Sequence, residues 1–475
     1  MNFLKLFLIS LVLILSACST IPSSPEKIDI GEIEFTPLRP HQWQLENGLK
    51  VIYLQDNELP LISGKIFYPG GSLFVDKAKT GLSSLTGGQM REGSIPGFSP
   101  EEFDSALNSI GASIETSFGE EFGSSSFFCL SEDVDRVFSW FSSVLRKPSF
   151  DQSRLALAKH LATQGIKRRR DRPGTIAGMT FTRAFYGWDS PYARYTSEAT
   201  LKNIKRSDLK KFHQRFVQPN AALLAMTGSL SLEEAKALVK KHLGSWKKSK
   251  VWEKPVNPEL PDALKPGVYV VERDFEQAKI LIGHAGPKRF SQDDFERIVY
   301  NRVFGHGGFS SILFSEIRSK LGLAYSVYGG FYPGTDDGML QIAAGTRSEQ
   351  AIKTAKEVIK LLEKSRVETF PLDKINNAKT STKRSFVFRF ESKSDVVFRQ
   401  ARQELLDYPE YYDQTYLDNV SSVKPEKVRE FASNWVRPEN LVIVVVGNVT
   451  AKSLKEAFPD RKVRELTFDT EPRLK

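Results

Sequence analysis

The sequence has few of the residues that staple a fold covalently or bind a metal. It contains two cysteines in 475 residues, and one of them, Cys18, lies in the N-terminal segment, so no disulfide framework is expected. Its six histidines are spread along the chain, and no two stand three or four residues apart, the spacing that places two imidazoles on one helix face. A self-contained zinc site of histidine or cysteine ligands is therefore not predicted.

A strong charge of one sign is also missing. Lys and Arg number 67 against 57 Asp and Glu, which gives a formal charge of +10, a mild bias for this length. The densest basic run, residues 167–172 (KRRRDR), could bind a polyanion. It continues an expected helix, LALAKHLATQGIK, and a solvated helix face is the favoured interpretation. No nucleic-acid motif accompanies it, so no nucleic-acid partner is predicted.

Long apolar runs are absent after the first twenty residues. With 40% hydrophobic and 26% charged residues, the chain is globular and too long for one core, so two or more domains are expected. The remaining cysteine, Cys129, lies in the apolar stretch SSSFFCLSE, which predicts a buried, inert thiol.

The first twenty residues, MNFLKLFLISLVLILSACST, predict a secretory signal. One positive charge, at Lys5, precedes an apolar stretch that is short for a membrane span. Leu15-Ser16-Ala17-Cys18 resembles the bacterial lipobox, which implies a signal peptide at 1–17 and lipidation of Cys18; an ordinary signal or membrane helix with an incidental cysteine is the disfavoured alternative. Residues 18–36 predict a tether, and Ser19 resembles the outer-membrane sorting signal of lipoproteins. We expect a membrane-anchored lipoprotein, in the outer membrane and facing the periplasm.

The chain contains an internal repeat. Residues 204–231 align with 423–450 without a gap at an offset of 219, which superposes Phe212 on Phe431 and Pro219 on Pro438. Both segments predict an amphipathic helix, a proline that ends it, an apolar strand and a glycine turn. Because both lie near the ends of halves of about equal length, duplication is the favoured explanation.

A proline-rich segment separates the two halves. Residues 247–267 contain four prolines that disfavour helix and central strand, at positions 255, 258, 261 and 266. We therefore predict an N-terminal domain at 37–246, a linker at 247–267 and a C-terminal domain at 268–475. Strands such as LKVIYLQ or VYVVER come first in each half and helices follow, which predicts an α+β domain twice over, each a β-sheet covered by helices.

Two stretches carry a family resemblance. LENGLKVIYLQDNELPLISGKIFYPGGSLFVDKAKTGLSSLTGGQMREGS and GFSSILFSEIRSKLGLAYSVY resemble the pitrilysin/insulinase metallopeptidases, in the branch of the processing peptidases. The resemblance extends over nearly the whole chain after the signal. It implies a peptidase-like fold of two homologous domains that act on peptides.

Active members of that family carry an inverted zinc motif, His-x-x-Glu-His, on the helix after the first Gly-Leu. The matching positions here are Ser84, Gly87 and Gly88, and a third family ligand, a glutamate, falls at Gly165. No ligand and no general base remain, so the resemblance implies a degenerate site without a metal. The two helix glycines indicate either relaxed selection or close approach of another backbone.

Two replacements for the lost chemistry are weaker alternatives. His160 lies near Gly165, but one imidazole does not build a zinc site, and a structural histidine is favoured. Glu120 and Glu121 could form an acid/base pair. A charged turn between two strands is the favoured interpretation of FGEEFG.

The second half, unlike the first, keeps the residues that the family uses there. Active family members supply an arginine and a tyrosine seven residues apart that hold the peptide and its developing oxyanion, and Arg318 and Tyr325 match them. Gly305, Gly307 and Gly308 resemble the glycine loop of non-catalytic processing-peptidase subunits, where flexible backbone engages substrate. A tight turn before a helix is an alternative for these glycines.

The pattern of loss and retention resembles the non-catalytic subunit of a two-chain enzyme. We expect a zinc-free subunit that binds no cofactor itself, paired with a zinc-bearing homologous subunit, and acting on peptide substrates. The alternative is a stand-alone peptide-binding or scaffolding protein without hydrolysis. A peptidase active by itself is disfavoured because it would need unrecognised ligands.

The predicted anchor can be tested directly. Cys18→Ala should release the protein from membranes without unfolding it, because acyl chains on Cys18 are the expected source of membrane affinity. The measurement is the distribution of wild type and variant between membrane and soluble fractions after a high-salt wash. A variant that still sediments with membranes would place the anchor elsewhere.

Overall fold

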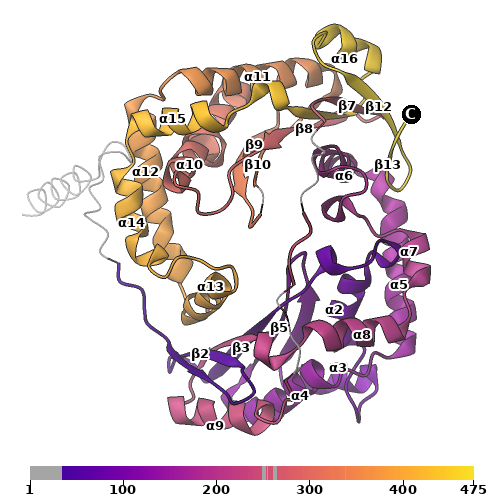
Figure 1. The fold of residues 1–475 in the computed structure, drawn as a ribbon, viewed down its shortest axis with the longest axis vertical. Coiled ribbons are helices and arrows are strands. Elements are labelled where there is room, and N and C mark those ends of the chain that lie inside the picture. Colours follow the sequence, from indigo (N-terminus) through magenta and orange to yellow (C-terminus); the bar gives the residue numbers. More distant parts are fainter. Residues whose placement is uncertain (1–34, 249–252, 254, 260–264, 337) are drawn as a thin grey trace, which may run out of the picture. The chain divides into compact units, whose positions relative to one another are not determined.

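The computed structural model describes residues 35–248, 253, 255–259, 265–336 and 338–475. The predicted signal peptide, Cys18 and most of the tether lie outside the described residues. Pro37–Lys475 form one compact unit built around two β-sheets (Figure 1).

The first sheet has the strand order β1-β2-β6-β3-β5-β4. Its central strand β6, LLAMTG, is buried throughout, as expected for an apolar strand with both faces covered. The strands of the first sheet are β1 (His41–Gln44), β2 (Lys50–Gln55), β3 (Leu61–Pro69), β4 (Ser113–Phe118), β5 (Phe122–Leu130) and β6 (Leu223–Gly228).

The second sheet has the order β13-β12-β7-β11-β8-β10-β9. From β7 to β9 it repeats the pairing of β2 to β4: one parallel pair followed by three antiparallel pairs. The strands of the second sheet are β7 (Gly267–Glu272), β8 (Gln277–Ala285), β9 (Ser326–Pro333), β10 (Gly338–Arg347), β11 (Val442–Gly447), β12 (Val463–Phe468) and β13 (Pro472–Leu474).

Helices cover both sheets, and several begin at capping boxes that the sequence specifies, such as Ser99 with Glu102 and Ser231 with Glu234. The first half contains α2 (Leu82–Glu92), α3 (Pro100–Ser109), α4 (Val134–Arg146), α5 (Gln152–Lys167), α6 (Pro173–Tyr186), α7 (Glu198–Asn203), α8 (Arg206–Phe216) and α9 (Leu232–Leu243). The second half contains α10 (Asp294–Asn301), α11 (Ala351–Val367), α12 (Leu372–Phe386), α13 (Lys393–Leu405), α14 (Tyr412–Ser422), α15 (Pro425–Trp435) and α16 (Ala451–Ala457). The α+β prediction is confirmed.

The internal repeat is confirmed in register. α15 begins and ends 219 residues after α8, and β11 begins and ends 219 residues after β6. The order of elements is more mixed than predicted, because β4 and β5 follow α2 and α3, and β6 and β11 come late in their halves. In the sheets, β6 is inserted between β2 and β3, and β11 is inserted between β7 and β8.

The two halves exchange one helix each. In the first sheet, Val51, Leu224 and Met226 face a core of the first half's own helices, while the alternate residues Ile52 and Ala225 face the other side. That side is covered by α13 of the second half through Val397 and Ala401 (Figure 1). One face of β6 is therefore buried by the first half and the other face by α13 of the second half.

The reciprocal contact is made by α6 of the first half. Its residues Ile176, Ala177 and Phe181 pack in one core with Val444 and other residues of the second sheet. Arg183 of α6 donates to the Glu471 carboxylate at 2.6 Å and to the Pro472 carbonyl at 2.8 Å. Because α6 and α13 occupy equivalent places in the repeat, the exchange is symmetric.

Residues 255–259 of the predicted linker form no helix or strand, in keeping with its prolines. Gly267, the last residue of the predicted linker, is already the first residue of β7. The two sheets lie on either side of the linker in sequence, but α6 and α13 each pack on the sheet of the other half. Within the described residues, no helix combines the length and apolar character that a membrane span requires.

The helix exchange predicts where a core mutation in α13 will act. Val397→Ala should lower the free energy of unfolding by about 2 kcal/mol and speed hydrogen exchange in β6 as well as in α13, because it removes two buried methyl groups from the first sheet's cover. Arg402→Ala, at an exposed position of the same helix, is the matched control and should stay within about 0.5 kcal/mol. If hydrogen exchange became faster only in the second sheet, the packing of α13 on the first sheet would be contradicted.

Candidate functional site

The helix that matches the family's zinc helix is α2. It begins after Gly81, whose φ of +104° is accessible to glycine, and it buries Leu82, Leu85 and Met90 against the first core. Ser84 is exposed and Gly88 is half-buried, while Gly87 is buried. These are the three positions where active relatives would carry two ligands and a base.

Gly87 is held against the edge strand β4. A Cβ atom at Gly87 would lie 2.7 Å from the Phe118 nitrogen and 2.9 Å from the Ser117 Cα, both backbone atoms. The Thr116 hydroxyl also donates to the Gly87 carbonyl. Close approach of another backbone therefore explains this glycine, and a glutamate side chain does not fit there unless β4 moves.

The other two glycines have no such constraint. A Cβ at Gly88 would meet only the Glu92 carboxylate, at 3.6 Å or more, and a Cβ at Gly165 on α5 would meet nothing within 4 Å. These positions leave room where active relatives would carry ligands. Close approach of another backbone therefore explains Gly87 but does not explain Gly88 or Gly165.

The residues present do not fit a zinc ion. Within the described ranges, no three His, Cys, Asp or Glu side chains gather at a point where they could hold a metal. His160 is exposed on α5. Cys129 is fully buried in β5, where burial raises the pKa of its thiol to about 12, so the prediction of an inert cysteine is confirmed.

Arg318 and Tyr325 lie on either side of one tight connection in the second half. Arg318 is exposed on the π-helical segment η11 (Phe314–Lys320), and its guanidinium carbon lies 4.8 Å from the centre of the Phe314 ring. Tyr325 precedes β9, and its side chain is 57% exposed. Its backbone N–H donates to the Gly345 carbonyl at 2.9 Å, which fixes the residue while its phenol points into solvent.

Tyr325 belongs to a series of exposed apolar side chains near β9, which we call the β9 apolar residues. Within the described chain no hydrogen bond joins the Arg318 and Tyr325 side chains to one another. The β9 apolar residues are Phe309, Leu321, Tyr325, Tyr328 and Tyr332.

The predicted glycine loop is only partly a loop. Gly305 is buried inside a second π-helical segment, η9 (Arg302–His306), and a Cβ there would lie 2.0 Å from the Gly329 carbonyl oxygen of β9. Gly305 is thus a packing residue rather than a loop residue, because β9 approaches it as β4 approaches Gly87. Gly307 follows η9, and Gly308 is exposed with a φ of +58° and nothing within 4 Å of its Cβ position. Only Gly307 and Gly308 lie in the expected turn.

Asn301, which sequence reasoning missed, closes part of the outer edge of β9. Its side-chain amide donates to the Phe331 carbonyl at 2.8 Å, and its side-chain oxygen accepts from the Phe331 N–H at 2.8 Å. Asn301 is 4% exposed, so this pairing is shielded from water. β9 is the last strand of its sheet, and Asn301 satisfies groups that a further strand would otherwise use.

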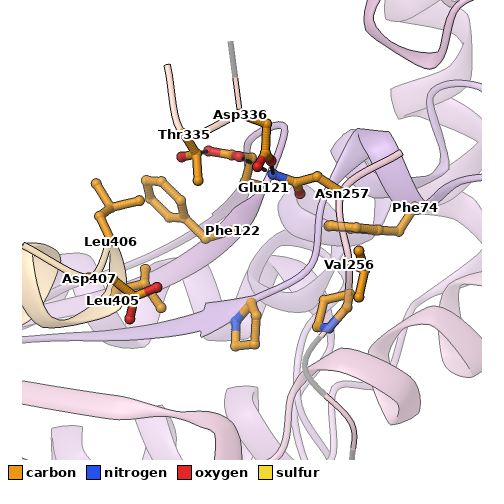
Figure 2. Close-up of a pocket in the computed structure, with 12 residues that line it drawn as sticks. Phe74, Glu121, Phe122, Val256, Asn257, Thr335, Asp336, Leu405, Leu406 and Asp407 are labelled. Atoms are coloured by element: carbon orange, nitrogen blue, oxygen red, sulfur yellow. Dashed lines mark hydrogen bonds between the residues drawn. The ribbon is translucent and has the colours of Figure 1, made fainter. Parts of the chain in front are cut away.

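The linker lines a cavity of about 300 Å³ together with the turn between β4 and β5 (Figure 2). Figure 2 shows Asn257 of the linker between Glu121 and Asp336, and its amide donates to both carboxylates at 2.6 Å. Thr335 donates to Glu121 at 3.3 Å. The charged-turn interpretation of Glu120 and Glu121 is confirmed, because both lie between β4 and β5 and Glu121 serves to hold the linker.

Comparison with known families agrees with these features. Residues 203–382 match the family described as "Peptidase M16 inactive domain". M16 is the family of the pitrilysin and insulinase enzymes, so the family resemblance is confirmed, and the matched segment is of the type described as inactive.

Some relatives are named as non-peptidases and others as zinc proteases. The chain is 24% identical over 415 residues to the "Non-peptidase homolog YmxG" of Helicobacter pylori, covering 86% of this chain and 94% of the relative. It is 23% identical over 392 residues to the "Uncharacterized zinc protease YmxG" of Bacillus subtilis, covering 82% and 94%. Likeness of this degree does not decide whether a chain hydrolyses peptides.

Solved structures share the fold. The peptidase M16 inactive domain from Pseudomonas fluorescens has a TM-score of 0.77 at 23% identity, covering 87% of this chain and 98% of that one. A protease from Helicobacter pylori has a TM-score of 0.76 at 20% identity, covering 86% and 100%. At these identities the comparison establishes the two-sheet fold alone.

The two adjacent helix glycines provide a matched test of the constraint at β4. Gly87→Ala should lower the free energy of unfolding by about 1–3 kcal/mol, because the added Cβ meets backbone atoms that cannot yield. Gly88→Ala should raise stability by up to about 1 kcal/mol, because its Cβ has room and alanine favours helix. Chemical denaturation of both variants measures the two changes in the free energy of unfolding. Equal changes would contradict the close approach of β4 to Gly87.

Proposed function

We propose that this chain is the zinc-free subunit of a two-chain peptidase of the insulinase type, whose homologous partner carries zinc. The observation that carries the proposal is a contrast between the halves. On α2 the metal positions hold Ser84, Gly87 and Gly88, and β4 fills the space that a side chain at Gly87 would need. In the second half, Arg318 and Tyr325 remain exposed.

The role of the exposed pair is to bind peptide and to stabilise charge. Arg318 presents a guanidinium group, and its contact with Phe314 restricts the freedom of its side chain. Tyr325 is held by its backbone while its hydroxyl is open to an incoming group. Donors aimed at an oxygen that becomes negative in the reaction act mainly in the transition state.

The proposed setting is the outer membrane, with the folded part facing the periplasm. The supporting observations are the lipobox-like sequence that ends at Cys18 and the serine that follows it. Acyl chains would then supply the membrane attachment. Peptides or proteins in the periplasm are the proposed substrates.

A stand-alone peptide-binding protein is the second candidate. It is favoured by the β9 apolar residues, because Phe309 is 80% exposed and Tyr325, Tyr328 and Tyr332 are exposed as well. Aromatic side chains of this kind dominate binding energies at protein interfaces. In that case the peptide would bind here without any catalytic partner.

The test begins with the intact lipoprotein, purified in mild detergent with the zinc-bearing homologue that accompanies it. In the resulting complex, Arg318→Ala or Tyr325→Phe should lower turnover about a hundredfold, roughly 3 kcal/mol, without dissociating the complex. Each variant loses a donor that acts in the transition state. Turnover, melting temperature and association are measured on the same samples.

Tyr411→Phe is the matched control, since Tyr411 is 62% exposed at the start of α14 and belongs neither to the β9 apolar residues nor to the family's Arg/Tyr spacing. Its turnover should remain near that of the wild type. If no homologue accompanies the protein, or if turnover is unchanged in both test variants, the binding-protein candidate replaces the subunit. A purified single chain with about one zinc and chelator-sensitive activity would overturn both.

A further inference from the structure

A second cavity lies wholly within the second half, between β9, α10 and helices α12 to α14. Its volume is about 430 Å³, within the range of small-molecule sites. Four arginines line it, together with one histidine and several tyrosines, and no Asp or Glu contributes to the lining. We call it the arginine cavity; its arginines are Arg297, Arg302, Arg389 and Arg399.

Two of the four guanidinium groups are neutralised in the structure. Arg297 donates to one Asp294 carboxylate oxygen at 2.9 and 2.8 Å, and both residues are buried. Arg399 donates to the two Asp413 carboxylate oxygens at 2.8 and 2.5 Å. These pairs fix the walls of the cavity, since two-point arginine–carboxylate contacts are geometrically specific.

The other two guanidinium groups have no carboxylate partner in the described chain. Arg302 donates from Nε to the Ser381 hydroxyl at 2.9 Å. Arg389 donates to the Tyr416 hydroxyl at 3.1 Å, and its guanidinium carbon lies 4.6 Å from the centre of the Tyr416 ring. Hydroxyl groups orient these arginines without cancelling their charge, so the cavity carries an excess of two positive charges.

Other polar groups at the wall do not offset that excess. Burial, with Arg297 and Arg302 nearby, lowers the pKa of His306 below its ordinary value, so its imidazole is neutral at pH 7. Burial, reinforced by Asp294, raises the pKa of Tyr412, which keeps its phenol neutral as well. The neutral rings of Tyr408, Tyr412 and Tyr332 provide flat apolar surface beside the charges.

We propose that the arginine cavity is a binding site for an oxyanion, a carboxylate or a phosphate, carried by a small aromatic or apolar ligand. The guanidinium fork matches both oxyanions, and a group of this kind would neutralise a partly buried charge that the fold leaves unpaired. The tyrosine rings would cover the uncharged part of the ligand. This site is separate from Arg318 and Tyr325, and it does not depend on the proposed partnership with a zinc-bearing chain.

The test uses the intact chain and calorimetric titration with three probes of similar shape: phenylacetate, phenyl phosphate and the neutral phenylacetamide. At least one anion should bind, and phenylacetamide should not. Arg302→Gln and Arg389→Gln should each weaken that binding at least about tenfold, because each removes a charged hydrogen-bond donor. Arg302→Lys keeps the charge and should retain part of the affinity.

Arg384→Gln is the matched control, because Arg384 is exposed on α12 and does not line the cavity. It removes the same net charge and should leave affinity unchanged. Melting temperatures identify any variant that fails to fold. If Arg389→Gln fails, Arg302→Gln and Arg302→Lys form a complete comparison, and if Arg302→Gln fails, Arg389→Gln against Arg384→Gln decides. Binding of neither anion, equal binding of phenylacetamide, or equal weakening in Arg384→Gln would overturn the proposal.

Two further probes distinguish the source of the oxyanion. An acetylated dipeptide that ends in phenylalanine is titrated with a free carboxylate and again as the amide. Carboxylate-dependent binding stronger than that of phenylacetate would identify a peptide terminus as the ligand. Binding of the dipeptide weaker than that of phenylacetate would identify a small organic anion, and either result supports an oxyanion site.

Discussion

The fold depends on the exchange of α6 and α13 between the halves. Each sheet has one face covered by helices of its own half and an opposite face that buries Ile52 and Ala225, or Val444 and its neighbours, only when the exchanged helix is present. Neither half therefore encloses a complete core. Each half repeats the sequence pattern and the strand order of the other, but only the two halves together form a stable core.

A second shared constraint shapes both candidate surfaces. At the outer edge of each sheet, a helix approaches the last strand so closely that only glycine fits, Gly87 against β4 and Gly305 against β9. The two contacts differ in detail, because Gly87 lies in an α-helix and Gly305 in a π-helical segment, but in both halves the last strand of the sheet leaves no room for a side chain.

Local signals in the sequence predicted much of this structure. The apolar strands, the prolines before β6 and β11, and the offset of 219 residues all reflect short-range patterns, and each agrees with the elements of the structure. α2, Arg318 and Tyr325 were singled out by the family resemblance rather than by these patterns. The exchange of α6 and α13 was not predictable, because an apolar helix face does not state which sheet it covers. The arginine cavity was missed because Arg302, Arg389 and Tyr416 come from separate segments that only tertiary packing unites. The segment Phe386–Phe390 (FVFRF) offered a sequence signal, because it places Arg389 between two phenylalanines.

The pairing of Asn301 with Phe331 has a consequence for how copies of this chain meet. An exposed edge strand invites a neighbouring molecule to extend the sheet, and β9 carries tyrosines that would favour such stacking. At Phe331 the backbone N–H and carbonyl are both hydrogen-bonded to the Asn301 side chain, so an incoming strand cannot pair with this residue. Together with the close packing of Gly305 on the Gly329 carbonyl, this pairing occupies the outer edge of β9 and disfavours cross-β growth there, while Tyr328 and Tyr332 remain exposed.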